Sequence, residues 1–168
     1  MPNDPVDTPE TGIEALYLKP GHLIRRAQQI AVAIFLEECG VFDLTPVQYA
    51  ALMAVRTNPG IDATRVAGLI AFDRATLGDV FDRLESKGWI ERLPSTRDRR
   101  IKALHLTAAG ETQLELCEAA VERVQERILS PLSGDERETM MRLLTKLVTA
   151  NNEASRAPRR DPGATVAA

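Results

Sequence analysis

The sequence predicts a mainly α-helical protein with a small β-hairpin, an α+β fold class, and three observations support this prediction. Apolar residues recur at spacings of three and four along most of the chain, which is the pattern of amphipathic helices. Apolar and polar residues alternate over residues 101–106, as in a half-buried strand. Aromatic residues make up only 4% of the 168 residues, which suits a helical core. Residues 73–107 join the helical and β signals, and the rest of the chain is organised around them.

This central stretch begins with a helix. Asp73 is a good N-cap, because its carboxylate can accept the free amide protons of the first turn. An apolar stripe follows at helical spacing, formed by Leu77, Val80, Phe81 and Leu84. The remaining faces hold polar residues that are free to meet solvent or a ligand: Arg74, Thr76, Asp79, Asp82, Arg83 and Ser86. Lys87 and Gly88 predict the helix end, with a cation in the last turn and a left-handed glycine after it.

A basic hairpin follows the helix. Residues 89–93 and 101–106 have strand character, and residues 94–100 between them are rich in turn-forming and basic residues. From Arg92 to Lys102 there are five cations and one acid, a local charge of +4. A helix with a free polar face beside a basic hairpin is the layout of a winged helix-turn-helix that binds DNA. The net charge of −3 argues only weakly against this, since DNA responds mainly to charge within about 8–10 Å.

Two motifs in this stretch form a specific signature: the run L-E-S-K-G-W-I-E-R and, after it, D-R-R-x5-L-T. On these motifs, the sequence resembles the MarR family of bacterial transcriptional regulators. The residues that carry the resemblance are Leu77, Val80, Leu84, Glu85, Lys87, Gly88, Trp89, Ile90, Glu91, Arg92, Asp98, Arg100, Leu106 and Thr107. Gly78 is a departure, because many members carry a small hydroxylated residue there. Glycine costs about 1 kcal/mol of helix stability relative to alanine and offers no hydroxyl to a phosphate.

The flanking sequence predicts further helices. One runs from about Pro20 to Cys39, and Thr45-Pro46-Val47-Gln48 is a capping box that starts the next. We expect a disordered tail over residues 1–12, an N-terminal dimerisation helix within 13–44 and the winged helix-turn-helix over 45–107. C-terminal dimerisation helices within 108–152 and a disordered tail over 153–168 follow. The apolar stripes of the outer helices exceed what one chain can cover, which predicts a homodimer with two-fold symmetry.

The candidate DNA-binding residues lie on the second helix of the helix-turn-helix and on the wing. On the helix they are Arg74, Thr76 and Arg83, and arginine suits guanine O6 and N7. The alternative for this helix is a solvated face, which its acids favour in part. On the wing the candidates are Arg97, Asp98, Arg99, Arg100 and Lys102. The resemblance implies that Asp98 fixes Arg100 against the minor groove or its phosphates, and that a dimer binds double-stranded DNA at a pseudo-palindromic operator.

A small-molecule site is a further hypothesis. The first helix carries His22, Arg25 and Arg26 at spacings of three and four, so one face offers an imidazole and a guanidinium to a carboxylate. The resemblance implies a pocket between the dimer helices and the winged domain for a small aromatic acid effector, with Tyr17 and His22 lining it and Arg26 pairing the carboxylate. The resemblance extends to repressors of aromatic-acid, and specifically nicotinate, catabolism. The alternative is that these side chains form salt bridges at the dimer interface.

Other classes of protein fit the sequence less well. An enzyme is disfavoured, because the chain has two histidines, no glycine-rich phosphate loop and no nucleophile elbow. We expect neither cofactor nor metal, since clustered Cys and His ligands are absent. Cys39 and Cys117 are expected to be buried, although a redox-sensing regulator stays an alternative, as does a winged helix that binds only proteins. No apolar run is long enough to span a bilayer, and we expect a cytoplasmic protein.

Overall fold

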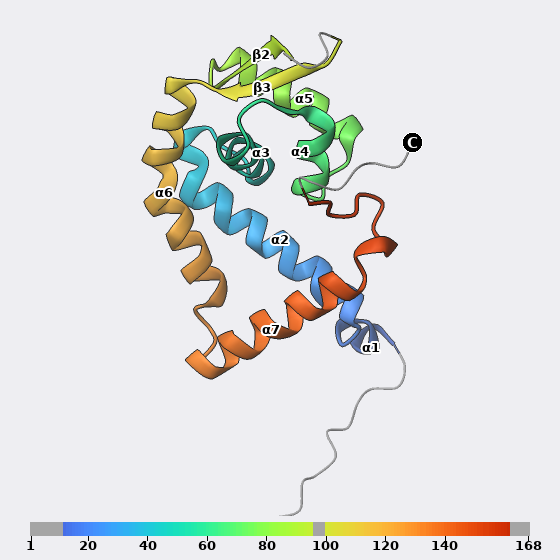
Figure 1. The fold of residues 1–168 in the computed structure, drawn as a ribbon. Coiled ribbons are helices and arrows are strands. Elements are labelled where there is room, and N and C mark those ends of the chain that lie inside the picture. Colours follow the sequence, from blue (N-terminus) through green and yellow to red (C-terminus); the bar gives the residue numbers. More distant parts are fainter. Residues whose placement is uncertain (1–11, 96–99, 162–168) are drawn as a thin grey trace, which may run out of the picture.

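The computed structural model describes residues 12–95 and 100–161, and a small sheet lies at one end of its helices (Figure 1). The helices are α1 (Ile13–Tyr17), α2 (Pro20–Cys39), α3 (Pro46–Thr57), α4 (Ala63–Leu69), α5 (Arg74–Ser86), α6 (Ala108–Leu129) and α7 (Gly134–Ala150). Two short 3-10 helices are η1 (Gly40–Phe42) and η2 (Asn152–Ala154). The strands are β1 (Ile61–Asp62), β2 (Ile90–Pro94) and β3 (Lys102–Leu106). The mainly α-helical fold with a small β-wing is therefore confirmed.

The wing is a three-stranded antiparallel sheet in the order β1-β3-β2. Strands β2 and β3 form the predicted hairpin, with Ile90 opposite Leu106 and Pro94 opposite Lys102. Strand β1 was not predicted; it pairs Ile61 with Leu104. Helices α3, α4 and α5 lie beneath the sheet (Figure 1), and their buried side chains form its hydrophobic support.

Side chains cap the starts of α3, α6 and α7, and the capping box predicted at Thr45 is confirmed. Thr45 and Gln48 form the capping box of α3, and Ser133 and Glu136 form that of α7. The Thr107 side chain accepts a hydrogen bond from the amide of Gly110 at the start of α6. These contacts satisfy amide groups that have no partner within their own helix.

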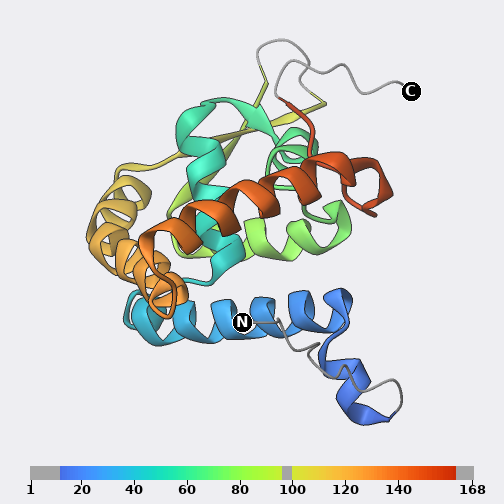
Figure 2. The same cartoon turned by 90° about the horizontal axis from the view of Figure 1, so that it is seen from below.

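The long helices α2 and α6 pack against one another below the winged domain (Figures 1 and 2). They contribute Phe35, Cys39, Cys117, Val121 and Val124 to the same buried cluster that holds the winged domain together. One core therefore runs from the sheet to these helices.

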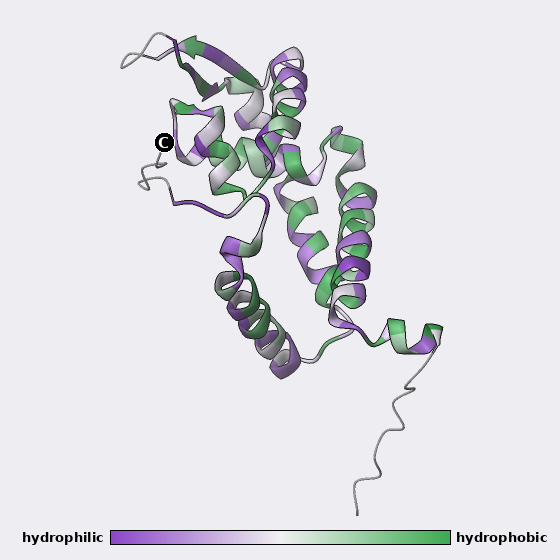
Figure 3. Cartoon of the chain, turned by 90° about the vertical axis from the view of Figure 1, so that its right-hand side faces the viewer, coloured by the Kyte–Doolittle hydropathy of each residue, from purple (hydrophilic) through white to green (hydrophobic). Residues whose placement is uncertain are grey.

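Helix α7 crosses the far end of the molecule and contains no buried residue (Figure 2). Its apolar side chains are exposed within one chain: Met141 51%, Leu143 50%, Leu144 37%, Leu147 44% and Val148 59%. Apolar residues likewise stay exposed along α2, including Leu23, Ile24 and Ile30, and Figure 3 shows hydrophobic (green) stretches recurring along the helices of the chain. No other part of the described chain covers these stripes, as expected for outer helices with more apolar surface than one chain can bury.

The C-terminal segment differs from the expected disordered tail. Residues 152–161 begin with η2 and return to α4, where the amide of Arg160 donates to the carbonyl of Gly68 at 2.8 Å. Residues 1–11 and 162–168, which hold the rest of the two predicted tails, lie outside the described residues. None of the helices in the described part of the chain has the length and apolar character to cross a membrane.

Candidate nucleic-acid interface

Helix α5 buries its apolar face in the core and exposes its polar face. Asp73 caps the helix as predicted, with Oδ1 accepting from the amide of Ala75 at 2.8 Å. Buried Leu77, Val80, Phe81 and Leu84 fix the orientation of the helix. The predicted DNA-binding side chains of this helix, Arg74, Thr76 and Arg83, are exposed. Because the apolar stripe is buried on the opposite side, these three are available to a large ligand.

Two acids of α5 are engaged by the wing. Arg92 of β2 contacts the Asp82 carboxylate at 2.5 Å and the Glu85 carboxylate at 3.3 Å. Arg92 therefore does not contribute to the free positive charge that was counted for residues 92–102. Its single positive charge offsets one of the two negative charges that Asp82 and Glu85 place on α5, the expected recognition helix.

The wing tip is only partly described. Arg100 and Lys102 are exposed, and Lys102 lies beside the end of β2 through its pairing with Pro94. The amide of Ser95 donates to the Ile101 carbonyl at 2.9 Å and closes the hairpin. The predicted residues Arg97, Asp98 and Arg99, and with them the expected action of Asp98 on Arg100, lie outside the described residues.

The base of the wing is locked to the helices by contacts that the sequence did not reveal. Lys87 lies 2.9 Å from the Asp43 carboxylate and 4.4 Å from the ring centroid of Trp89. Gly88 takes the predicted left-handed conformation, with φ 71°. The hydroxyl of Thr107 donates to the Gly88 carbonyl at 2.6 Å. These contacts join the end of α5 to Asp43, to the first residue of the wing segment and to the start of α6.

The predicted ligand-binding residues gather at the junction of α1 and α2. The rings of Tyr17 and His22 lie 5.5 Å apart, and His22 Nε2 is buried without a hydrogen-bond partner in the structure. Arg25 donates to Gln29 on the same helix at 2.9 Å, and Arg26 is exposed. The structure thus brings Tyr17 and His22 together, while the two arginines point to no common partner within the described chain.

Comparisons with known proteins agree with this geometry. The model of the MarR family matches residues 44–102. Transcriptional regulator HosA of Escherichia coli O111:H- is 33% identical over 136 residues, which cover 81% of this chain and 99% of that protein. This chain belongs to the MarR family. The HTH-type transcriptional repressor NicR of Pseudomonas putida is 28% identical, over 80% of this chain and 85% of its own.

Solved structures of MarR-type proteins have the same fold. A cysteine-to-serine variant of MarR from Escherichia coli, complexed with operator DNA, superposes with a TM-score of 0.75 at 28% identity, over 82% of this chain and 99% of that one. BpsR of Bordetella bronchiseptica, whose DNA binding is regulated by 6-hydroxynicotinic acid, has a TM-score of 0.74 at 30% identity, over 78% and 94%. These relatives are transcriptional regulators, and their structures show that this MarR-family chain has the winged helix-turn-helix fold.

The two cysteines of this MarR-family protein are both fully buried, as predicted. Burial raises the pKa of the Cys39 thiol, and the nearby Glu38 carboxylate raises it further. Burial also raises the pKa of the Cys117 thiol. Thiolate is the reactive form, so this environment disfavours the redox-sensing alternative.

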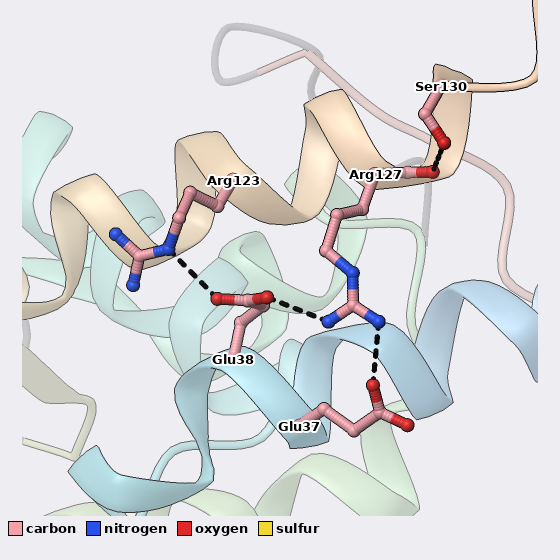
Figure 4. A network of polar contacts seen from close by, with 5 residues as sticks. All are labelled: Glu37, Glu38, Arg123, Arg127 and Ser130. Atoms are coloured by element: carbon pink, nitrogen blue, oxygen red, sulfur yellow. Dashed lines mark hydrogen bonds and ion pairs between the residues drawn. The ribbon is translucent and has the colours of Figure 1, made fainter.

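An ionic cluster that was not predicted joins α2 to α6 (Figure 4). The Glu38 carboxylate accepts from Arg123 Nε at 2.9 Å and from Arg127 at 2.7 Å, and Arg127 also donates to Glu37 at 2.7 Å. Both hydrogen bonds lower the pKa of the Glu38 carboxyl, and the one from Arg123 has the larger effect. No local pattern could have revealed the cluster, because its partners are 85 to 90 residues apart.

Proposed function

We propose that this MarR-family chain is a homodimeric transcriptional repressor that binds a pseudo-palindromic operator and is released by a small aromatic or heteroaromatic carboxylate. The observation that carries the DNA-binding part is the capped, exposed face of α5 beside the wing. Arg74, Thr76 and Arg83 face outward from α5, and its two wing-side acids are paired with Arg92. Cations near phosphates supply most of the sequence-independent affinity for DNA.

The homodimer is supported by the unburied apolar stripes of α2 and α7. Large apolar surfaces of this kind usually mark an interface, and a two-fold dimer covers both stripes with the same surface of a second copy. Two winged domains about one DNA turn apart then face successive major grooves, which is the geometry that reads an inverted repeat.

The effector part is supported by the α1–α2 corner. The buried, unpartnered Nε2 of His22 is a polar atom that a ligand can satisfy, and the Tyr17 ring beside it suits an aromatic ligand. Exposed Arg26 supplies a guanidinium for a carboxylate, with Arg25 one residue before it. The BpsR relative responds to 6-hydroxynicotinic acid, which makes hydroxylated nicotinates the first compounds to test.

The test is binding to DNA from upstream of the protein's own gene, measured by fluorescence anisotropy between 50 and 200 mM salt. We expect tight, salt-dependent binding, and Arg100→Ala should reduce the salt slope by about one unit for each bound subunit. Arg142→Ala is the matched control, because this arginine is exposed on α7, away from the wing (Figure 1). Absence of binding by the unaltered protein at low salt would overturn the proposal in favour of a protein-binding winged helix.

The effector is tested in the same assay with 6-hydroxynicotinate, nicotinate and benzoate as probes. One of these acids should release the DNA from the unaltered protein. Arg26→Ala should bind DNA normally but resist release, because the carboxylate loses its partner. Arg26→Lys should respond partly, since lysine keeps the charge but lacks the paired donors. Release of Arg26→Ala at the same acid concentration would place the effector elsewhere.

A further inference from the structure

The C-terminal segment, residues 152–161, is closed on itself by side-chain contacts. The amide of Arg159 donates to Asn152 Oδ1 at 2.8 Å, and Asn152 Nδ2 donates to the Arg159 carbonyl at 3.2 Å. Arg160 binds Glu153 with both terminal nitrogens, at 2.6 and 2.8 Å. Such paired contacts give the segment a defined loop shape rather than that of an extended tail.

The loop is seated on α4 at Gly68. Besides the hydrogen bond from the Arg160 amide to the Gly68 carbonyl, a Cβ at Gly68 would lie only 3.1 Å from Arg160 Cβ. The absence of a side chain at Gly68 is therefore what lets the two backbones approach so closely. Ala157 and Pro158 of the segment are half-buried in this contact.

This seating places Arg156 at the first turn of the recognition helix. Arg156 Nη2 lies 3.5 Å from Asp73 Oδ2, and its side chain is 92% exposed. Arg156 and Arg74 line the same cavity of about 280 Å³, together with Phe72 and Asp73. In helix-turn-helix proteins the N-terminal residues of the recognition helix lie against the DNA, so Arg156 lies where phosphates approach.

The charges of the segment distinguish Arg156 from its neighbours. Arg160 is paired with Glu153, and Arg159 with Asp161 at 3.1 Å, so both find acids within the segment. Arg156 contacts an acid of another element, and an exposed pair at this distance contributes little. The other carboxylate oxygen of Asp73, Oδ1, accepts the hydrogen bond from the Ala75 amide. A phosphate can therefore replace Asp73 as the partner of Arg156 while Asp73 still caps α5.

We propose that residues 152–161 form part of the DNA interface, and that Arg156 contacts a backbone phosphate beside the start of the recognition helix. This inference rests on the proposed DNA-binding function. The interface then has three parts on each subunit: the wing, α5, and a cation delivered from the far end of the chain by the seated loop.

The experiment compares operator binding by the full-length protein and three variants between 50 and 200 mM salt. Arg156→Ala should lower the slope of log K against log salt concentration by about one unit per subunit. For a dimer, the ratio of the affinity of the unaltered protein to that of the variant should therefore fall about tenfold from 50 to 200 mM salt. Arg156→Lys should restore the slope, because lysine keeps the charge. Arg159→Ala, which removes the same charge from the same segment but on the side that faces α7, should bind like the unaltered protein.

Three results would overturn the inference: an unchanged slope for Arg156→Ala, an equal loss for Arg159→Ala, or no rescue by lysine. Each of these leaves the proposed function intact as long as the unaltered protein binds in a salt-dependent way. Failure of the unaltered protein to bind would instead reject the proposed function itself. Circular dichroism of each variant verifies folding, which the high exposure of Arg156 predicts to be unaffected.

Discussion

Replacing Gly78 with alanine is expected to stabilise the protein, although the residue lies in the recognition helix. Gly78 is exposed inside α5, and a Cβ built there meets no heavy atom of the surrounding structure within 4 Å. The gain is therefore the difference in helix propensity, about 1 kcal/mol. For a protein of this size, that difference raises Tm by about 2–4 °C.

Gly110→Ala is the matched substitution with the opposite expected sign. Its Cβ would lie 2.1 Å from the carbonyl oxygen of Trp89 and 2.7 Å from Leu106 Cδ1. The Trp89 oxygen is backbone, so it moves only if the start of the wing moves with it. Overpacking of this kind costs about 1–3 kcal/mol, and helix propensity recovers only part of that cost.

The assay is thermal unfolding followed by circular dichroism, without DNA, at one protomer concentration for all three proteins. Equal concentration matters because association stabilises a folded chain. A Tm for Gly78→Ala at or below that of the unaltered protein would refute the reasoning that a Cβ at position 78 meets no neighbouring atom. An unchanged Tm for Gly110→Ala would refute the close approach of α6 to Trp89.

Three further predictions concern the long helices. Glu38→Gln should lower Tm at neutral pH, because Arg123 and Arg127 lower the pKa of Glu38 in the native protein. The difference in Tm from the unaltered protein should shrink as pH falls below about 4.5 and Glu38 becomes protonated in both the folded and the unfolded state. Thermal scans from pH 7 to 3 would show this, and a constant difference would contradict it. Leu147→Glu should split the proposed dimer toward the 18.5 kDa protomer in sedimentation velocity, whereas an unchanged mass would remove α7 from the interface. Cys39 and Cys117 should stay unreactive toward Ellman's reagent in the native protein at pH 7.5 and react fully after unfolding, since burial raises the pKa of both thiols; rapid native labelling would revive the redox-sensing alternative.

Features encoded by neighbouring residues were predictable. The cap at Asp73, the left-handed Gly88 and the capping box at Thr45 each depend on residues within one helical turn. The apolar stripe of α5 was placed correctly for the same reason, because helical periodicity decides which face is buried. The helix caps, the buried face of α5 and the β2–β3 hairpin therefore followed from the sequence.

Contacts between distant residues were not predictable. Strand β1 has two residues and exists because Ile61 meets Leu104, which no local pattern encodes. Arg92 was counted as a free cation, but its partners on α5 become visible only when the hairpin folds back. The composition of residues 153–161 is typical of a disordered segment. The feature that lets this segment pack is the bare backbone at Gly68, which lies more than 80 residues earlier in the chain.

The pairing of Arg92 with α5 has a mechanical consequence. It joins α5 to β2, while the contacts of Lys87 and Thr107 join the end of α5 to Asp43 and to the start of α6. Neither α5 nor β2 can tilt alone without separating Arg92 from Asp82 and Glu85. If the proposed effector acts on DNA binding, we therefore expect it to turn α5 and the wing together rather than to bend a single helix.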